Sequence, residues 1–280
     1  MTKIAVHLHL YYLEQLDDIL QRLSYLDVCK YDLFVTMSEL NPQAHEKIIK
    51  FNPNATLWQT PNLGYDVGPF IDFLHKIKLD DYDYILKIHT KRMDEKCYSL
   101  FNGKWFNSKT WREMLLDSVL FSSTAVRKNL DLMKNDKVIG MIGNFYTLTD
   151  EKIYLPPKEK IKKEMSKLGL SIPSDLHFVA GTMFLVRAQL LKPFLVYNIK
   201  DFAKTDKRFR DNTLAHMCER LFCFAIAAQG YKIQGVKYRH YWQETTIAAV
   251  KRFLFQKKIT HHGNLIIKIC KIPVCIKEIK

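Results

Sequence analysis

Strand-like and helix-like patterns alternate through the first third of the chain. Short apolar runs are followed repeatedly by segments whose apolar residues recur at helical spacing. The expected strands are 3–10, 31–37, 56–59 and 82–88, and the expected helices are 12–26, 42–51 and 67–77. Because successive strands joined by helices run parallel with right-handed crossovers, this order predicts an α/β fold with a mostly parallel central sheet.

The rest of the chain continues this pattern less regularly. The expected elements are helices at 112–134, 188–194 and 213–228 and strands at 138–142, 178–186 and 231–236. Residues 145–175 are loop-like and basic. We therefore expect one domain over 1–250, followed by a helical, basic tail over 251–280.

Size and composition fit a globular protein. The 280 residues are 48% apolar and 12% aromatic, which is enough for a sizeable core. No apolar run reaches the roughly 18 residues of a membrane span, and the first residues lack the apolar region of a signal peptide. The six cysteines are scattered without zinc-site spacing, so we expect reduced thiols in a cytoplasmic protein.

The formal net charge of +14 favours polyanionic partners: nucleic acid, anionic lipid or phosphorylated substrates. Basic residues cluster at 157–168 and again from Lys251 to Lys280. The second run interleaves its cations with bulky apolar residues, a composition typical of segments that lie in a membrane interface. The tail is therefore expected to bind an anionic membrane surface; the alternative is that it packs on its own domain.

An apolar strand that ends in charged residues marks the expected site. Tyr84–Ile88 reads as a buried strand, and His89, Lys91 and Arg92 follow it. In open α/β sheets, ligands bind outside the carboxyl ends of the strands. One imidazole and two cations at that edge predict contact with an anion such as a diphosphate; the alternative is a solvated loop.

The preceding turn adds a second part of the expected site. Asn62 and Gly64 tolerate positive φ and allow a sharp bend, and Asp66 follows at the start of a helix. One interpretation is a carboxylate that faces the base or ribose of a nucleotide. The alternative for Asp66 is a helix cap.

Two later segments supply further candidates. Gly181 lies inside the apolar run Phe178–Phe184, where a glycine often marks the close approach of a ligand or of another backbone. His216 and Glu219 are three residues apart on an expected helix and therefore share a face. Glu219 is a candidate general base for an acceptor hydroxyl; a surface pair is the alternative.

These motifs taken in order resemble the rhamnan synthesis F family of bacterial cell-surface polysaccharide glycosyltransferases. The motifs are Asn-x-Gly-x-Asp-x-Gly, Tyr-Asp-Tyr-x-Leu-Lys-x-His-Thr-Lys, Phe-x-Ala-Gly-Thr-Met-Phe and Ala-His-x-x-Glu-Arg, and the resemblance covers roughly residues 1–243. It implies a GT-A-like fold, with a Rossmann-type donor-binding half at 1–92 and an acceptor and catalytic half at 93–250.

The resemblance also bears on metal dependence. In GT-A enzymes the fourth strand usually ends in Asp-x-Asp, which binds a metal and the donor diphosphate. His89-Thr90-Lys91 takes that place in this chain. We therefore expect no metal site and no required cofactor, with cationic side chains in contact with the diphosphate.

The resulting hypothesis is an inverting glycosyltransferase at the inner face of the cytoplasmic membrane. It would move rhamnose or another sugar, such as galactofuranose, from a nucleotide-sugar donor to a lipid-linked or polysaccharide acceptor. Asn62, Gly64 and Asp66 would line the nucleotide pocket. Two alternatives remain. One is a basic nucleic-acid-binding protein, although no helix-turn-helix, RRM, KH or zinc pattern is present, and the other is a non-catalytic glycan-binding domain.

Overall fold

The computed structural model describes residues 2–94, 98–150, 152, 155–204, 213–259, 264–270 and 272–278. The chain divides into two compact units. The first holds the residues up to Lys91 together with Met114–Tyr238, and the second holds Arg92–Glu113 together with the residues from Arg239 onward. This division differs from the expected boundary after residue 250, because the segment that follows Lys91 packs with the C-terminal part of the chain.

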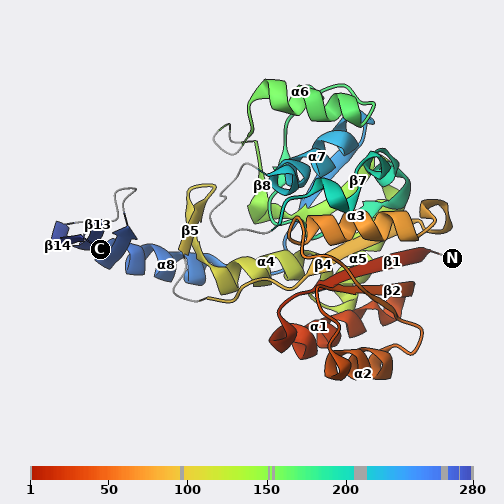
Figure 1. Ribbon diagram of the computed structural model, residues 1–280, viewed down its shortest axis with the longest axis horizontal. Helices are drawn as coiled ribbons and strands as arrows, with labels where there is room; N and C mark the ends of the chain where they lie inside the picture. Colours follow the sequence, from red (N-terminus) through yellow and green to blue (C-terminus); the bar gives the residue numbers. More distant parts are fainter. Residues whose placement is uncertain are drawn as a thin grey trace. The chain divides into compact units, whose positions relative to one another are not determined.

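The first unit is built on a twisted sheet (Figure 1). Among the described residues the spatial strand order is β11 (Lys232–Val236), β7 (Ile139–Asn144), β10 (Phe184–Arg187), β4 (Tyr84–His89), β1 (Lys3–Leu10), β2 (Lys30–Met37) and β3 (Thr56–Gln59). Only β10 runs antiparallel to its neighbours in this sheet. The predicted α/β class with a mostly parallel central sheet is therefore confirmed.

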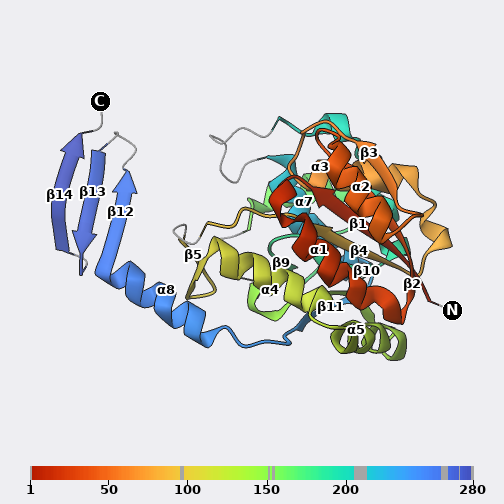
Figure 2. The same ribbon diagram turned by 90° about the horizontal axis from the view of Figure 1, so that it is seen from below.

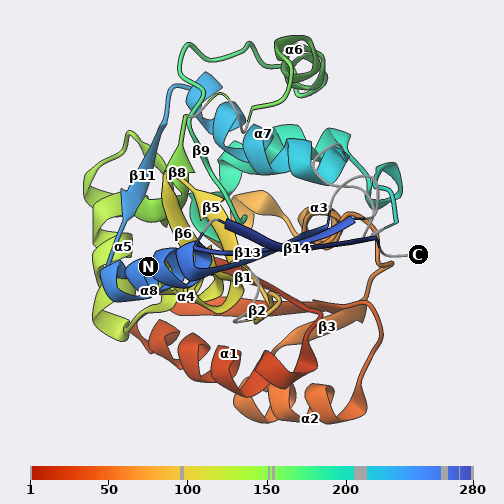
Figure 3. The ribbon, with the colours of Figure 1, turned by 90° about the vertical axis from the view of Figure 1, so that its left-hand side faces the viewer.

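Helices cover both faces of this sheet, as Figures 1 and 3 show. On one face lie α3 (Val67–Lys76) and α7 (Leu214–Ala228), with α6 (Lys158–Lys167) against α7; on the other lie α1 (Leu16–Leu23) and α2 (Pro42–Phe51). Local sequence signals set the helix ends. The Asn41 side chain accepts a hydrogen bond from the Ala44 N–H at 2.9 Å, and Pro42 occupies the first helical position of α2.

Aromatic side chains form the core beneath α3 and α7. Phe222 of α7 lies 5.5 Å from Phe70 of α3, 5.5 Å from Phe184 of β10 and 4.7 Å from Phe194, measured between ring centroids. All four side chains are fully buried. Burying each contributes about 1.5–3 kcal/mol, which fixes α3 and α7 on the sheet.

Two expected elements are interrupted. The helix expected at 112–134 is two helices, α4 (Ser108–Leu120) and α5 (Ser123–Asn135), because Ser122 caps the second by accepting from the Ala125 N–H at 3.2 Å. The strand expected at 178–186 is broken between β9 (Phe178–Val179) and β10. Gly181 and Thr182 lie between them with φ of +96° and +51°, which a strand does not accommodate.

Two further expectations are corrected in detail. The basic stretch 145–175 is not only loop, since it includes α6 and the short strand β8 (Leu148–Thr149), which pairs with β9. The short helix expected at 188–194 is a 3₁₀ helix over Ala188–Val196, and Pro193 lies inside it. Proline lacks the N–H that a regular α-helix requires at that point.

Among its described residues the second unit contains α8 (Trp242–Leu254), the first part of α4 and two small sheets. The hairpin of β5 (Tyr98–Phe101) and β6 (Lys104–Asn107) packs with α8, where the Arg252 guanidinium lies 4.8 Å from the Trp105 ring centroid. After α8, β12 (Phe255–Ile259), β13 (Asn264–Ile269) and β14 (Ile272–Glu278) form an antiparallel sheet (Figure 2).

The tail expected to be helical from residue 251 therefore differs from the structure. Its first residues complete α8, and its described residues beyond Leu254 are mostly strands. Residues 260–263, 271 and 279–280 of the expected tail lie outside the described part of the chain. Among the described residues, no helix combines the length and apolar character needed to cross a bilayer.

Candidate active site

A buried ion pair lies near the carboxyl end of β4. Lys87 is fully buried within the strand, and its Nζ pairs with Asp66 Oδ2 at the N-terminus of α3. The Lys87 Nζ also donates to the Thr182 carbonyl oxygen at 2.9 Å, and Thr182 Oγ1 donates to Asp66 Oδ2 at 2.5 Å. The Phe70 ring covers the ammonium, with its centroid 5.3 Å from Nζ. The cation is thus enclosed and held by Asp66.

The pKa values follow from this enclosure. Burial opposes the charged form of Asp66, but His89, Lys87 and the Thr182 hydroxyl outweigh that effect and hold its pKa well below the usual range. Burial lowers the pKa of Lys87, and Asp66 partly offsets the shift. The carboxylate of Asp66 is therefore charged at neutral pH and engaged with protein groups.

Three buried histidines border this pair. The register of the parallel strands places His7 of β1 beside Lys87 and His9 beside His89. Thr36 Oγ1 of β2 lies 3.1 Å from His7 Nε2 and 3.0 Å from His9 Nδ1. Burial lowers the pKa of His9 from 6.5 to about 4, and it lowers the pKa values of His7 and His89 well below 6.5. All three imidazoles are therefore neutral at pH 7.

His89 points toward Asp66 rather than into solvent. The residue is 3% exposed, and its Nδ1 lies 3.5 Å from Asp66 Oδ2 with no hydrogen-bond partner among the described residues. The next residue, Thr90, ties β4 to β1, because its Oγ1 accepts from the backbone N–H groups of Tyr11 and Tyr12, both at 2.9 Å. A neutral ring at this point can exchange hydrogen bonds but supplies no positive charge.

The Gly181–Thr182 turn joins the ion pair to Glu219. Thr182 contacts Asp66 and Lys87, and the preceding Gly181 N–H donates to Glu219 Oε1 at 2.6 Å. The other carboxylate oxygen of Glu219 accepts from Arg220 Nη1 at 2.5 Å. Both Glu219 oxygens are thus oriented by the protein, while the side chain keeps 18% of its surface exposed.

Packing accounts for glycine at position 181. A Cβ there would lie 2.5 Å from Leu115 Cδ1, and the backbone has φ of +96°. The close approach that the sequence suggested at Gly181 is therefore an approach by a side chain of this protein. Whether a donor also contacts Gly181 stays a prediction.

The Asn62–Asp66 turn has the sharp bend that its glycine suggested. Gly64 has φ of +68°, and a Cβ on it would lie 2.7 Å from the Phe202 ring. Tyr65 also has positive φ, and its ring lies 5.4 Å from the ring of His216. The turn is therefore tied to α7. Asp66 precedes α3, but its side chain makes no capping hydrogen bond to that helix.

The other expected site residues are placed as follows. His216 Nδ1 lies 2.8 Å from Thr213 Oγ1, and Asn62 is exposed. The Lys91 backbone is fixed through Gln15, whose Nε2 donates to the Lys91 carbonyl at 2.6 Å. Arg92 belongs to the second unit, where its Nη2 pairs with Asp94 at 2.8 Å. The first unit thus brings Asp66, His89, Gly181 and Glu219 into one connected network.

Sequence reasoning missed Lys87, Thr182 and His9. A lysine inside the apolar run Tyr84–Ile88 is itself a signal, because a buried cation requires a partner. His9 is likewise a polar residue in an apolar strand. Nothing local marks Thr182, whose role depends on the fold.

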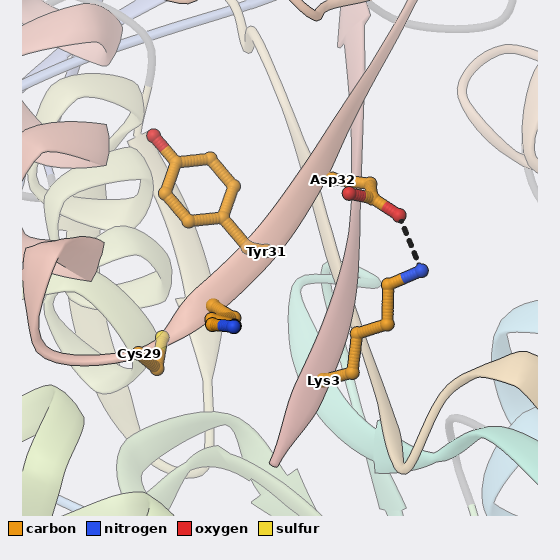
Figure 4. A pocket seen from close by; sticks show the side chains of 5 residues that line it. Lys3, Cys29, Tyr31 and Asp32 are labelled. Atoms are coloured by element: carbon orange, nitrogen blue, oxygen red, sulfur yellow. Dashed lines mark ion pairs between the residues drawn. The ribbon is translucent and has the colours of Figure 1, made fainter. Parts of the chain in front are cut away.

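Two further features of the described residues bear on this site, namely the metal-ligating side chains and the surface hollows. No group of three or more histidine, cysteine, aspartate or glutamate side chains there is arranged to hold a metal ion. An open hollow lies elsewhere, lined by Lys3, Cys29, Lys30, Tyr31 and Asp32 (Figure 4). Since Lys3 and Lys30 begin β1 and β2, this hollow lies at the opposite edge of the sheet.

Comparison with known proteins supplies the family. A family model described as rhamnan synthesis protein F matches residues 1–231. The chain belongs to this family. The predicted family is therefore confirmed, and the match includes each of the site residues above.

Individual relatives are more distant. WxcX, from two strains of Xanthomonas campestris pv. campestris, is 23% identical over 243 residues, which are 83% of this chain and 32% of WxcX. The chain thus spans about a third of the length of these curated relatives.

Solved structures show only a distant likeness. TarS of S. aureus (residues 1–349) is 11% identical with a TM-score of 0.43, covering 85% of this chain and 59% of that one. The mannosyltransferase PcManGT from Pyrobaculum calidifontis, solved with GDP-Man and Mn²⁺, is 13% identical with a TM-score of 0.43, covering 84% and 55%.

Proposed function

We propose that this protein is a GT-A-like glycosyltransferase that moves a sugar from a nucleotide-sugar donor to a hydroxyl group of a lipid-linked or polysaccharide acceptor. One observation carries the proposal: a buried polar cluster at the carboxyl ends of β1 and β4 is joined by a single turn to the oriented carboxylate of Glu219. Ligands of open α/β sheets bind outside these strand ends. Membership in a family named for rhamnan synthesis supports a role in polysaccharide formation.

The donor lies, in this proposal, against the Asn62–Asp66 turn and the end of β4. A leaving diphosphate gains negative charge as the glycosidic bond breaks, so it needs fixed hydrogen-bond donors and cations. Lys87 is committed to Asp66, and His89 is neutral, so neither supplies a cation to the diphosphate. Lys91, two residues beyond the end of β4, is the proposed cation in the first unit.

Glu219 is the proposed general base. The Gly181 N–H and Arg220 hold its two oxygens, and each carboxylate oxygen retains a further lone pair for an acceptor proton. A single positioned carboxylate suits direct displacement with inversion at the anomeric carbon. His216 lies one turn away on the same helix and contacts Tyr65 of the donor-side turn.

Metal-independent transfer is part of the proposal. His89-Thr90-Lys91 at the end of β4 offers a cation and no carboxylate, and carboxylate oxygens are what Mn²⁺ and Mg²⁺ prefer. We expect donor binding to persist in excess EDTA. Loss of binding in chelator and its recovery with manganese would contradict this part.

The membrane surface is the proposed location of the acceptor. Helix α8 exposes Trp242, Ile247, Val250, Phe253 and Leu254, with Trp242 at 66%. From Lys251 onward the sequence has eight lysines and arginines against one acidic residue, Glu278. Exposed apolar side chains beside cations suit the interface of an anionic leaflet. We propose that the protein works at the inner face of the cytoplasmic membrane. The candidate sugar that it transfers is rhamnose or galactofuranose.

Thermal unfolding with UDP, GDP and dTDP, with and without manganese or EDTA, tests the donor site. A nucleotide present at 100 times its Kd stabilises the folded protein by about 2.7 kcal/mol, so the true donor's nucleotide stands out. Lys91→Ala weakens this binding by about 1–3 kcal/mol, the range for a hydrogen bond to a charged group.

Other outcomes contradict the proposal. Absence of any nucleotide effect, together with salt-sensitive binding to any DNA duplex, indicates a nucleic-acid-binding protein. Stabilisation by glycosides alone indicates a non-catalytic glycan-binding domain.

A further inference from the structure

An exposed aromatic turn lies at the same edge of the sheet as the candidate site. Phe145 and Tyr146 belong to the 3₁₀ turn Phe145–Thr147 that directly follows β7, and their rings meet edge to face at 5.6 Å. Both β7 and β4 run antiparallel to β10, so the carboxyl ends of β7 and β4 share one edge. Phe145 is 49% exposed there, although the Lys237 Nζ lies 4.9 Å from its ring centroid.

Two glycines seat this turn closely on the sheet. Gly143 of β7 and Gly235 of β11 face each other across the parallel pair. A Cβ on Gly235 would lie 3.0 Å from Phe145 Cα, and a Cβ on Gly143 would lie 2.7 Å from Val179. The backbone of Phe145 is therefore held at a fixed distance from the strands.

A buried asparagine fixes the turn from inside. Asn144 is 2% exposed; its Oδ1 accepts from the Tyr146 N–H at 2.8 Å, and its Nδ2 donates to the Met114 carbonyl. An aromatic ring that is exposed on a rigid backbone loses little conformational entropy when a ligand covers it.

The turn is also connected to the proposed base. The Thr147 carbonyl accepts from the Ala180 N–H at 3.0 Å, and the next residue, Gly181, donates its N–H to Glu219. The strand pair β8–β9 continues this connection. The aromatic turn and the Glu219 carboxylate thus belong to one hydrogen-bonded framework.

We propose that Phe145 and Tyr146 form the platform on which a sugar ring of the acceptor stacks, with Lys237 as a hydrogen-bond donor to its hydroxyl groups. A sugar ring presents C–H groups on its face and hydroxyl groups at its rim. The C–H groups can pack on the electron-rich face of an aromatic ring, and the hydroxyl groups can accept hydrogen bonds from a nearby ammonium group. This inference rests on the proposed function, because it assigns the acceptor side of the same site.

Saturation-transfer NMR with methyl α-L-rhamnopyranoside, methyl β-D-galactofuranoside and methyl α-D-glucopyranoside tests the platform. In the wild-type protein, saturation reaches the C–H protons of at least one glycoside. Phe145→Ala lowers that glycoside's affinity by about tenfold, the upper range for one aromatic contact, while Phe145→Tyr keeps it. Leu195→Ala is the matched control, since Leu195 is 39% exposed and follows the end of β10 at the opposite edge.

The readouts separate this inference from the donor site. The thermal shift caused by the nucleoside diphosphate is the same in Phe145→Ala and in the wild type, and it also reports that the variant is folded. Equal saturation transfer to the glycoside in Phe145→Ala and in the wild type overturns the platform. Absence of saturation transfer from the wild-type protein to all three glycosides also overturns it. If saturation transfer depends on Phe145 but no nucleotide stabilises the protein, the platform is supported and the proposed glycosyltransferase function is refuted.

Discussion

At the scale of single residues, the Lys87–Asp66 pair sets the electrostatics of the candidate site. A lone lysine as buried as Lys87 would be destabilising by several kcal/mol. Asp66 and the Thr182 carbonyl offset that penalty by accepting from its ammonium group. The pair therefore stabilises the fold around the site, and the proposed donor diphosphate would need its cation from another residue.

Removing one member of this pair leaves a mostly buried charge. Lys87→Met is expected to lower the free energy of unfolding by about 3–5 kcal/mol, measured by urea denaturation at pH 7. Lys3→Met is the control, because the Lys3–Asp32 pair leaves 45% and 44% of its side chains exposed and contributes less than about 1 kcal/mol. Equal losses in the two variants would show that Lys87 is not an essential partner of Asp66.

Acid sensitivity follows from the buried histidines. The pKa of His9 is about 4 in the folded state and 6.5 ordinarily. Between pH 6.5 and pH 4 the His9 imidazole is therefore protonated in the unfolded chain but neutral in the folded protein. This contribution to the free energy of unfolding is therefore fully present above pH 6.5. It decreases as the pH falls toward 4, by about 1.4 kcal/mol per pH unit for each such histidine. His7 and His89 act in the same direction.

The variant His9→Gln isolates one of these contributions. It keeps a polar partner for Thr36 and is expected to make the slope of unfolding free energy between pH 6.5 and 4 shallower by up to about 1.4 kcal/mol per pH unit. An unchanged slope would mean that His9 is already protonated in the folded state.

Some residues of the candidate site could be predicted from the sequence and others could not. Asp66, His89 and Glu219 were predicted because each lies in a local pattern: a turn, a strand end, a helix face. Lys87 and Thr182 acquire their roles from contacts between residues 21, 95 and 116 positions apart. The sequence marks Lys87 as a charge inside an apolar run, but it does not identify the distant residues that Lys87 and Thr182 contact.

At the scale of elements, the Gly181–Thr182 turn connects the ion pair to Glu219. Gly181→Ala combines an unfavourable φ of +96° with a Cβ that lies 2.5 Å from Leu115 Cδ1. The first effect costs about 1–2 kcal/mol and the second about 1–3 kcal/mol, and the shifted N–H releases Glu219. We expect lower stability and lower turnover.

A second glycine gives the matched control. Gly169 has φ of +70° and no atom within 4 Å of a would-be Cβ, so Gly169→Ala costs only the conformational part, about 1–2 kcal/mol. Adding Leu115→Ala to Gly181→Ala removes the colliding side chain and is expected to recover turnover. If Gly181→Ala and Gly169→Ala are equally stable and active, the packing at Gly181 is not what orients Glu219.

Regular elements were predicted best. The strands β1, β2, β3 and β4 and their helices were predicted because short apolar runs alternate along the chain with segments whose apolar residues recur at helical spacing. The breaks at Ser122 and Gly181 were missed because the apolar pattern continues through both. A cap or a positive φ overrides such a pattern only once the neighbouring elements are in place.

At the scale of the whole molecule, the division into units was not predictable from local patterns. The segment Arg92–Glu113 lies far in sequence from α8 but packs with it. The basic run that begins at Lys251 was expected to be a separate tail, but its first residues belong to α8. The surface to test for membrane contact therefore includes α8.

Sedimentation with vesicles tests that surface. We expect the full chain to pellet with phosphatidylserine-rich vesicles, more weakly at high salt, because each cation near the leaflet contributes about 1 kcal/mol. Ile247→Ser with Val250→Ser removes apolar contacts worth about 1.5–3 kcal/mol each, so most of the protein stays in solution. The control, Leu195→Ser with Val196→Ser, changes exposed residues outside α8 and keeps binding. Equal pelleting of both double variants would exclude α8 as the membrane contact.

Release of nucleoside diphosphate from a panel of UDP-, GDP- and dTDP-sugars tests the account most directly. The wild-type protein is expected to release one nucleotide, in water or with an added glycoside acceptor, and to do so in EDTA. Glu219→Gln keeps the shape of the side chain and its contact with the Gly181 N–H but removes the base, so turnover falls by about 10²–10⁴-fold while nucleotide binding is retained. No release from any donor, or equal release by Glu219→Gln and the wild type, would contradict the account.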